Sequence, residues 1–211
     1  MNREPWRTYL VTQESLSSGR STQAIVEAAI EGGIDAIQLR EKETSALARY
    51  ELGGELRRLT ADADVPLLVN DRVDLAAAID ADGVHVGQDD LPVEVARSIL
   101  GTDAIVGCSA STVPEAEAAV EAGADYLGVG SVYGTTSKDV SDDRDGVGPD
   151  RIREIAESVE VPVIGIGGIT PENAGAVIEA GADGVAVISA ITAADDPARA
   201  TAALQEAVAN V

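Results

Sequence analysis

Short apolar runs alternate along this chain with longer stretches in which apolar residues recur every three or four positions. Runs of about four to eight residues between helical stretches of ten or more are typical of βα units with a buried parallel sheet. The pattern predicts strands at about 7–12, 34–40, 65–70, 83–87, 104–109, 126–132, 161–167 and 184–189. It predicts helices at about 21–32, 44–63, 72–80, 92–100, 113–122, 149–159, 171–180 and 196–208. Prolines near four of these helix starts agree with the helix positions, because the first turn needs no N–H.

A small-residue turn followed by an apolar run recurs along the chain, as in GGIDAIQLRE (32–41), DADGVHVG (80–87), AGADYLGVGSV (122–132) and AGADGVAVIS (180–189). Eight βα units in 211 residues fit an α/β fold, a single (β/α)8 TIM barrel at its compact end. A doubly wound open sheet is the alternative, but it usually has fewer strands and a glycine-rich first turn, which TQESLSSGRST is not. No linker or composition break divides the chain, so we expect one domain over residues 1–211.

The charge balance narrows the possible partners. The formal net charge is −22, and only two of the 15 basic residues are lysines. Such a surface repels phosphate backbones and anionic lipid, so we expect neither nucleic acid nor a membrane as a partner. An acid-rich, lysine-poor surface also suggests a halophilic source, where high salt screens self-repulsion.

Three features favour a cytoplasmic location. The single cysteine, Cys108, excludes an internal disulfide and fits a reducing compartment. No apolar run approaches the roughly 18 residues of a membrane span. The first residues, MNREPWRTYLV, lack the apolar stretch of a signal peptide.

A TIM barrel carries its chemistry at the carboxyl ends of its strands and in the loops beyond them. The second predicted strand ends in Gln38, Arg40, Glu41 and Lys42, and side chains of alternate residues share one face. A cation facing inward is costly unless it meets an anion. Phosphate binding is the favoured interpretation, and pairing with neighbouring carboxylates is the alternative.

The third and fourth predicted strands lead into Asn70, Asp71 and Asp90. Carboxylates beside an amide suit Mg²⁺, which prefers oxygen ligands and shares phosphate oxygens. Asp71 and Asp90 also precede helices and could instead be N-caps. Beside the cations of the second strand, metal ligation is the better account.

The roles of several other residues remain open. His85 lies within the fourth strand, pointing inward or outward, and a lone strand histidine is more often structural than catalytic. Cys108 has the pattern of a small buried residue. Ser109, Ser111 and Thr112 end the fifth strand, where they contact a ligand or cap the next helix. Trp6 and Tyr9 close the bottom of the barrel or lie in a subunit contact.

Two later segments suggest further binding loops. The longest loop, residues 133–150, is polar and holds Lys138 behind Thr135, Thr136 and Ser137; long βα loops are usually lids or binding loops. The seventh strand ends in GIGGI (165–169), and the eighth ends at Ser189. Loops after strands seven and eight form the usual phosphate site of this fold. The chain therefore predicts two anion sites, one cationic and metal-assisted, one built from backbone.

Several motifs run nearly end to end: QLREK at 38–42, ND at 70–71, DGVHVGQDD at 82–90, GCSAST at 107–112, GSVYGTTSK at 130–138, GIGGIT at 165–170 and AVISAI at 186–191. Their order and spacing resemble the thiamine-phosphate synthase family. The resemblance implies a Mg²⁺-dependent transferase of thiamine biosynthesis. Such an enzyme joins 4-amino-2-methyl-5-(diphosphooxymethyl)pyrimidine to a (carboxylated) methylthiazole ethyl phosphate and releases pyrophosphate.

The resemblance also implies residue roles. The pyrimidine diphosphate would bind residues 38–42 (Gln38, Leu39, Arg40, Glu41 and Lys42) together with Asn70, Ser109 and Lys138. Of these, Arg40, Lys42 and Lys138 would act on the leaving diphosphate, while Asp71 and Asp90 would ligate Mg²⁺. The thiazole partner would meet Thr135, Thr136 and Ser137, and its phosphate would meet Gly168, Ile188 and Ser189. Ser111 stands where many members have histidine.

Two rival functions remain. A thiazole tautomerase on the same barrel would bind the thiazole phosphate but would not need the diphosphate set. A non-catalytic barrel that senses a phosphorylated metabolite is the second. A homo-oligomer is possible in each case.

Overall fold

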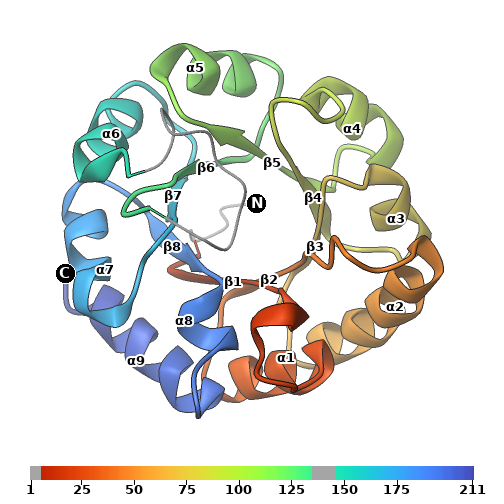
Figure 1. The fold of residues 1–211 in the computed structure, drawn as a ribbon. Coiled ribbons are helices and arrows are strands. Elements are labelled where there is room, and N and C mark those ends of the chain that lie inside the picture. Colours follow the sequence, from red (N-terminus) through yellow and green to blue (C-terminus); the bar gives the residue numbers. More distant parts are fainter. Residues whose placement is uncertain (1–5, 135–145) are drawn as a thin grey trace.

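The computed structural model describes residues 6–134 and 146–211, which form a closed barrel of eight parallel strands in chain order (Figure 1). The strands are β1 (Thr8–Val11), β2 (Ala36–Leu39), β3 (Leu67–Asn70), β4 (Gly83–Val86), β5 (Ile105–Ala110), β6 (Tyr126–Gly130), β7 (Val163–Ile166) and β8 (Gly184–Val187). The ring closes because β8 pairs with β1, with Thr8 opposite Val185. The TIM barrel expected from the sequence is confirmed, and the alternative open sheet is wrong.

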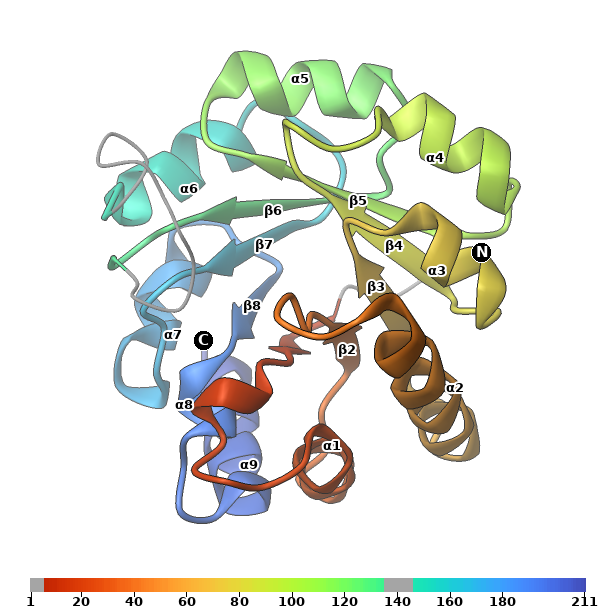
Figure 2. The same ribbon diagram turned by 45° about the vertical axis from the view of Figure 1, so that its right-hand side comes forward.

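The helices form a ring outside the strands (Figures 1 and 2). They are α1 (Thr22–Glu31), α2 (Ala46–Asp62), α3 (Val73–Ala78), α4 (Val93–Leu100), α5 (Val113–Glu121), α6 (Gly148–Ala156), α7 (Pro171–Glu179), α8 (Ser189–Thr192) and α9 (Pro197–Ala209). A short 3-10 helix, η1 (Glu14–Leu16), follows β1. The sequence did not predict η1 or α8, because three or four residues show no helical period. None of the helices that the structure describes is long and apolar enough to cross a membrane.

Two apolar layers hold the barrel together. The larger lies between the sheet and the helices and includes Leu39, Val69 and Val84. The smaller fills the barrel interior, where Tyr9, Leu68 and Tyr126 pack among aliphatic side chains. Strand residues alternate between the two layers, so a residue's parity decides whether it faces the helices or the barrel axis.

The four repeated turns noted in the sequence have one structural function. Each places an aspartate just before an even-numbered strand, and its carboxylate accepts the backbone N–H near the start of the preceding odd-numbered strand. The bonds join Asp35 to Thr8 N (2.8 Å), Asp82 to Leu67 N (2.8 Å), Asp125 to Val106 N (2.7 Å) and Asp183 to Val163 N (2.8 Å). The repeat is therefore a pair of strands closed at its amino end by one carboxylate.

The aromatic residues near the N-terminus pack at the amino end of the barrel interior. The Trp6 ring meets the rings of Tyr9 and Tyr126 edge-on, at centroid distances of 5.6 and 5.4 Å. Trp6 lies two residues before β1, and its indole packs against the interior layer of the barrel. This packing agrees with closure of the bottom of the barrel, one of the two alternatives from the sequence.

Candidate active site

Strand β2 sends alternate side chains inward, as its sequence predicts. Gln38 is 2% exposed and donates from Nε2 to the Tyr9 hydroxyl at 2.8 Å. Arg40, also buried, donates from Nη1 to Gln13 Oε1 at 2.9 Å. Leu39 lies in the layer between sheet and helices. Only the backbone of Leu39 is therefore available to a ligand inside the barrel.

The Glu41 side chain turns toward the segment that follows β1. Its carboxylate accepts the Glu14 backbone N–H at 2.9 Å and the Thr22 hydroxyl at 2.9 Å, and the residue is buried. These bonds fix η1 next to Gln13, the residue that holds Arg40. In the structure Glu41 thus supports the loop that orients the arginine.

Three charged side chains meet beyond β2, β3 and β4. Lys42 Nζ lies 3.1 Å from Asp71 Oδ2. Partial burial raises the pKa of Asp90, the N–H of Gly87 at 2.8 Å opposes this rise, and the nearby Asp71 carboxylate adds to it. Charges from three separate strands therefore converge, as the sequence predicts.

Neither of these carboxylates caps a helix. The residue at the N-cap of α3 is Arg72 and that of α4 is Pro92, and neither helix has a side-chain cap bond. Asp71 instead adopts a left-handed backbone, with φ of 63°, while its N–H bonds the His85 carbonyl at 2.8 Å. The N-cap alternative is wrong for both aspartates, and both carboxylates stay at the strand ends.

A metal would find two carboxylates here. In the described part of the chain no group of three or more His, Cys, Asp or Glu side chains could hold a metal by itself. Mg²⁺ is usually held by one or two carboxylates and by substrate phosphates, with waters completing its shell. The donor set of Asp71 and Asp90 fits that ion when a phosphorylated ligand is present.

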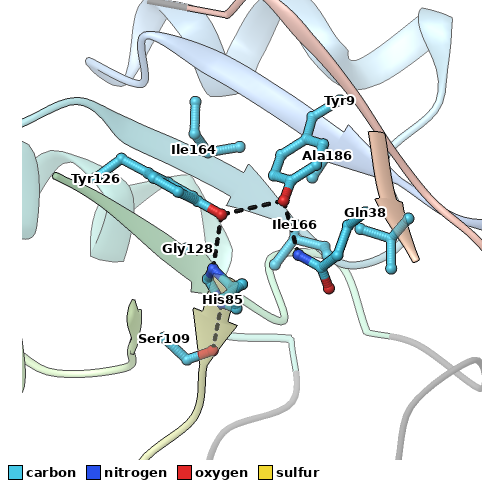
Figure 3. Close-up of a pocket in the computed structure, with 10 residues that line it drawn as sticks. Tyr9, Gln38, His85, Ser109, Tyr126, Gly128, Ile164, Ile166 and Ala186 are labelled. Atoms are coloured by element: carbon cyan, nitrogen blue, oxygen red, sulfur yellow. Dashed lines mark hydrogen bonds between the residues drawn. The ribbon is translucent and has the colours of Figure 1, made fainter. Parts of the chain in front are cut away.

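A chain of hydrogen bonds crosses the barrel interior (Figure 3). The Tyr9 and Tyr126 hydroxyls lie 3.1 Å apart, and the Tyr126 hydroxyl lies 2.9 Å from His85 Nδ1. His85 Nε2 in turn lies 2.9 Å from Ser109 Oγ. Gln38 lies at the other end and is joined through Tyr9. Two expected substrate-binding residues are therefore connected by three residues to which the sequence assigned no ligand-binding role.

Two glycines make room for this chain. A Cβ at Gly107 would lie 2.2 Å from the Tyr126 ring, and one at Gly128 would lie 2.8 Å from His85 Cε1. Both glycines sit in strands that flank or face these rings. A glycine inside a strand pattern marks a close approach, but the sequence alone does not say which side chain approaches these two glycines.

The remaining positions of the fifth strand divide as follows. Thr112 caps α5, since its hydroxyl accepts the Glu115 N–H at 3.3 Å, and the Ser111 N–H bonds the Glu115 carboxylate at 2.7 Å. Cys108 is buried, and that burial raises the pKa of its thiol to about 11. Ser109 alone of this group joins the interior chain. Asn70 ends β3 and pairs in register with His85.

The second predicted anion site lies beyond the neighbouring strands β7 and β8. Gly168 is exposed with φ of 64°, and a Cβ there would lie 2.5 Å from the Gly134 carbonyl oxygen, so only glycine fits. Ile188 is buried in the interior layer, whereas Ser189 is exposed and begins α8. Thr135, Thr136, Ser137 and Lys138, expected beside this site, lie outside the described residues.

The fold and these side chains define a TIM-barrel protein with a polar site at the carboxyl ends of its strands, where enzymes of this fold carry their active sites. The model of the thiamine monophosphate synthase family matches residues 8–191. Thiamine-phosphate synthases from Natronomonas pharaonis and Haloarcula marismortui are each 63% identical to this chain over 96% of its length, covering 95% and 97% of their own. The solved thiamine phosphate pyrophosphorylase from Pyrococcus furiosus superposes with a TM-score of 0.89 at 42% identity, over 97% of this chain and 96% of that one.

The chain belongs to the thiamine-phosphate synthase family. This confirms the family, the synthase function and the transferase class expected from the sequence. Both of these synthases come from halophiles, in agreement with the halophilic composition.

Proposed function

We propose that the chain condenses 4-amino-2-methyl-5-(diphosphooxymethyl)pyrimidine with methylthiazole ethyl phosphate, carboxylated or not, and releases pyrophosphate with the help of Mg²⁺. The carboxylated thiazole would also lose its carboxylate as CO₂. The meeting of Lys42, Asp71 and Asp90 at one edge of the barrel supports this most strongly. Cations and a metal at such a point would stabilise the negative charge on a leaving diphosphate. In this proposal the enzyme is cytoplasmic and consists of one domain over residues 1–211.

Each end of the pyrimidine diphosphate has its own set of side chains in this proposal. Gln38 and Ser109 hold the pyrimidine ring. The diphosphate is held by the backbone of Leu39 and by the side chains of Arg40, Lys42, Asn70 and Lys138. Glu41 supports the loop beside Arg40. Asp71 and Asp90 would hold Mg²⁺, which when bound neutralises charge on the diphosphate. Arginine holds an oxyanion with a rigid fork and lysine with a point charge, so the two act together on the leaving group.

The thiazole phosphate binds on the other side of the mouth. Its phosphate meets Gly168, Ile188 and Ser189, and its ring meets Thr135, Thr136 and Ser137. The exposed position of Gly168 supports this, because a residue without a side chain lets a phosphate approach the backbone N–H groups. The two substrates then face each other across the mouth, and holding them so accelerates their reaction.

A dissociative displacement suits these residues. The carbon–oxygen bond to the diphosphate breaks first, its electron pair leaves with the pyrophosphate, and the amino group stabilises the pyrimidine methylene cation. The thiazole nitrogen then forms the new bond with its lone pair. The path requires leaving-group stabilisation rather than a strong base, and Arg40, Lys42 and Lys138 supply that stabilisation.

A pyrophosphate-release assay tests the proposal, with both substrates, Mg²⁺ and high KCl. Calorimetry with the pyrimidine diphosphate, with and without Mg²⁺, separates the rivals. Metal-dependent binding with turnover supports the synthase. Little binding of this ligand would indicate a thiazole tautomerase, and binding without turnover would indicate a sensor.

A further inference from the structure

The interior chain from Gln38 to Ser109 has a direction. The Gln38 side-chain nitrogen can only donate, and it donates to the Tyr9 hydroxyl at 2.8 Å. The Tyr9 proton is then directed to the Tyr126 hydroxyl, 3.1 Å away. Tyr126 therefore accepts from Tyr9 and gives its own proton to His85 Nδ1 at 2.9 Å.

The direction determines the tautomer of His85. With Nδ1 accepting, the ring carries its proton on Nε2 and donates to Ser109 Oγ at 2.9 Å. The Ser109 hydroxyl, once its oxygen accepts, offers its own proton to a further acceptor. Burial raises the pKa of both Tyr9 and Tyr126 well above the ordinary value, so each phenol keeps the single proton that this order requires.

The Gln38 end of this hydrogen-bond network offers an acceptor, whereas the Ser109 end offers a donor. Gln38 Oε1 is buried and finds no hydrogen-bond donor in the described part of the chain. Gln38 lines a cavity of about 20 Å³ that Tyr9, Tyr126 and His85 also line, with room for a group the size of a water molecule or an amino group (Figure 3). A buried acceptor without a donor is costly, so a ligand N–H that reaches it gains affinity.

We propose that Tyr9, Tyr126 and His85 are positioning residues that make Gln38 an acceptor and Ser109 a donor toward the pyrimidine ring. The proposal rests on the synthase function above. A 4-aminopyrimidine carries both complements, since its amino group donates and its ring nitrogens accept. The three residues act through Gln38 and Ser109 and need not touch the ligand.

The direction of the hydrogen bonds can be tested directly by measuring the tautomer of His85. His85 is the only histidine, so labelling histidine ring nitrogens yields a single pair of NMR signals. The wild-type protein without substrate should show Nε2 protonated and Nδ1 unprotonated. If the Gln38 amide were turned by 180°, every hydrogen bond of the network would run in the opposite direction and His85 would carry its proton on Nδ1. A proton found on Nδ1 would therefore overturn the proposal.

Two isosteric variants test the relay. Tyr126→Phe removes the donor to Nδ1, and Tyr9→Phe removes the bond that commits the Tyr126 proton; both keep the ring packing. Each should give a mixture of the two tautomers and raise the KM for the pyrimidine diphosphate about tenfold, the effect of one lost hydrogen bond, with the thiazole phosphate KM unchanged. Should Tyr126→Phe fail to fold, Tyr9→Phe carries the same test.

Tyr50→Phe is the matched control, because it deletes a hydroxyl from an exposed position on α2. It should leave the tautomer and both KM values as in the wild type. Wild-type tautomer ratios in both relay variants, or altered ratios with an unchanged KM, would overturn the proposal. A wild-type protein without synthase activity would overturn the proposed function and its ligand, while the tautomer, measured without substrate, still reports on the relay.

Discussion

Lys42 Nζ and Asp71 Oδ2 lie 3.1 Å apart at the mouth of the barrel, where two of the expected active-site residues form an ion pair. The lysine side chain is 55% exposed and the aspartate 26%. An exposed pair of this kind stabilises a protein by about 0–1 kcal/mol. Its stabilising effect is therefore small, and its value lies in holding an ammonium group beside a carboxylate that is also suited to a metal.

Replacing the lysine should separate stability from activity. Lys42→Ala is expected to lower kcat about a hundredfold, because the leaving diphosphate loses a positive charge, while the free energy of unfolding falls by less than about 1 kcal/mol. Pyrophosphate release at saturating substrates and thermal unfolding measure the two effects. Arg72→Ala is the control, since it breaks the neighbouring exposed pair with Asp74 and should leave kcat unchanged. Full activity in Lys42→Ala would remove the lysine from the leaving-group role.

The aspartates should control the metal requirement. Asp71→Asn weakens an oxygen ligand and leaves Lys42 without its carboxylate, so the Mg²⁺ concentration for half-maximal activity should rise at least about tenfold. Asp90→Asn should have a similar effect. Magnesium titrations of pyrophosphate release measure both. Asp89→Asn, at an exposed neighbouring position, should keep the wild-type requirement. An unchanged titration in both Asp71→Asn and Asp90→Asn would exclude this metal site.

Gly128→Ala tests the space that the histidine needs. The new Cβ would lie 2.8 Å from His85 Cε1, so either the imidazole ring or the strand must shift. Such overpacking costs about 1–3 kcal/mol, and the KM for the pyrimidine diphosphate should rise as well. Gly54→Ala on α2 meets no atom within 4 Å and should stabilise the protein by about 0.5–1 kcal/mol. Urea unfolding and steady-state kinetics of the two variants give the comparison, and equal behaviour would contradict the assigned packing.

The repeated aspartates should matter for stability alone. Asp183→Ala leaves the N–H of the buried Val163 without its acceptor at 2.8 Å, which costs about 1–3 kcal/mol. Asp103→Ala is the comparison, because that exposed aspartate precedes the odd-numbered strand β5. Thermal unfolding should show a lower Tm for Asp183→Ala only, with kcat unchanged in both. A Tm loss of the same size in Asp103→Ala would mean that the carboxylate bond has no special role.

The barrel could be predicted from sequence because its signal is periodic. Apolar runs and helical spacing located eight strands and eight helices, and the repeated turns marked the strand pairs that the aspartates close. The elements that escaped, η1 and α8, are too short for any period. Their positions depend on contacts such as that between Glu41 and Glu14, which link residues far apart in the chain.

The charged edge of the site was also predictable, since a parallel barrel brings all strand ends to one side. The hydrogen-bond network inside the barrel was harder to predict from the sequence. The alternation around His85 left inward and outward orientations equally open, and nothing local indicates that Tyr126 reaches it from two strands away. The choice depends on Gly107 and Gly128, whose missing side chains become informative only when the register of β4, β5 and β6 is known.

High salt should stabilise this protein strongly. The chain carries a net charge of −22, and its exposed acids repel one another until salt screens them over about 3 Å at molar ionic strength. The Tm should rise by about 10 °C or more between low and multimolar KCl. A variant with Glu117→Gln, Glu121→Gln and Glu157→Gln, all at exposed positions, should be more stable at low salt and gain less from KCl. If its Tm follows the wild type at every salt concentration, self-repulsion between these acids is not what salt relieves, and a Tm that is flat in the wild type would contradict the halophilic adaptation itself.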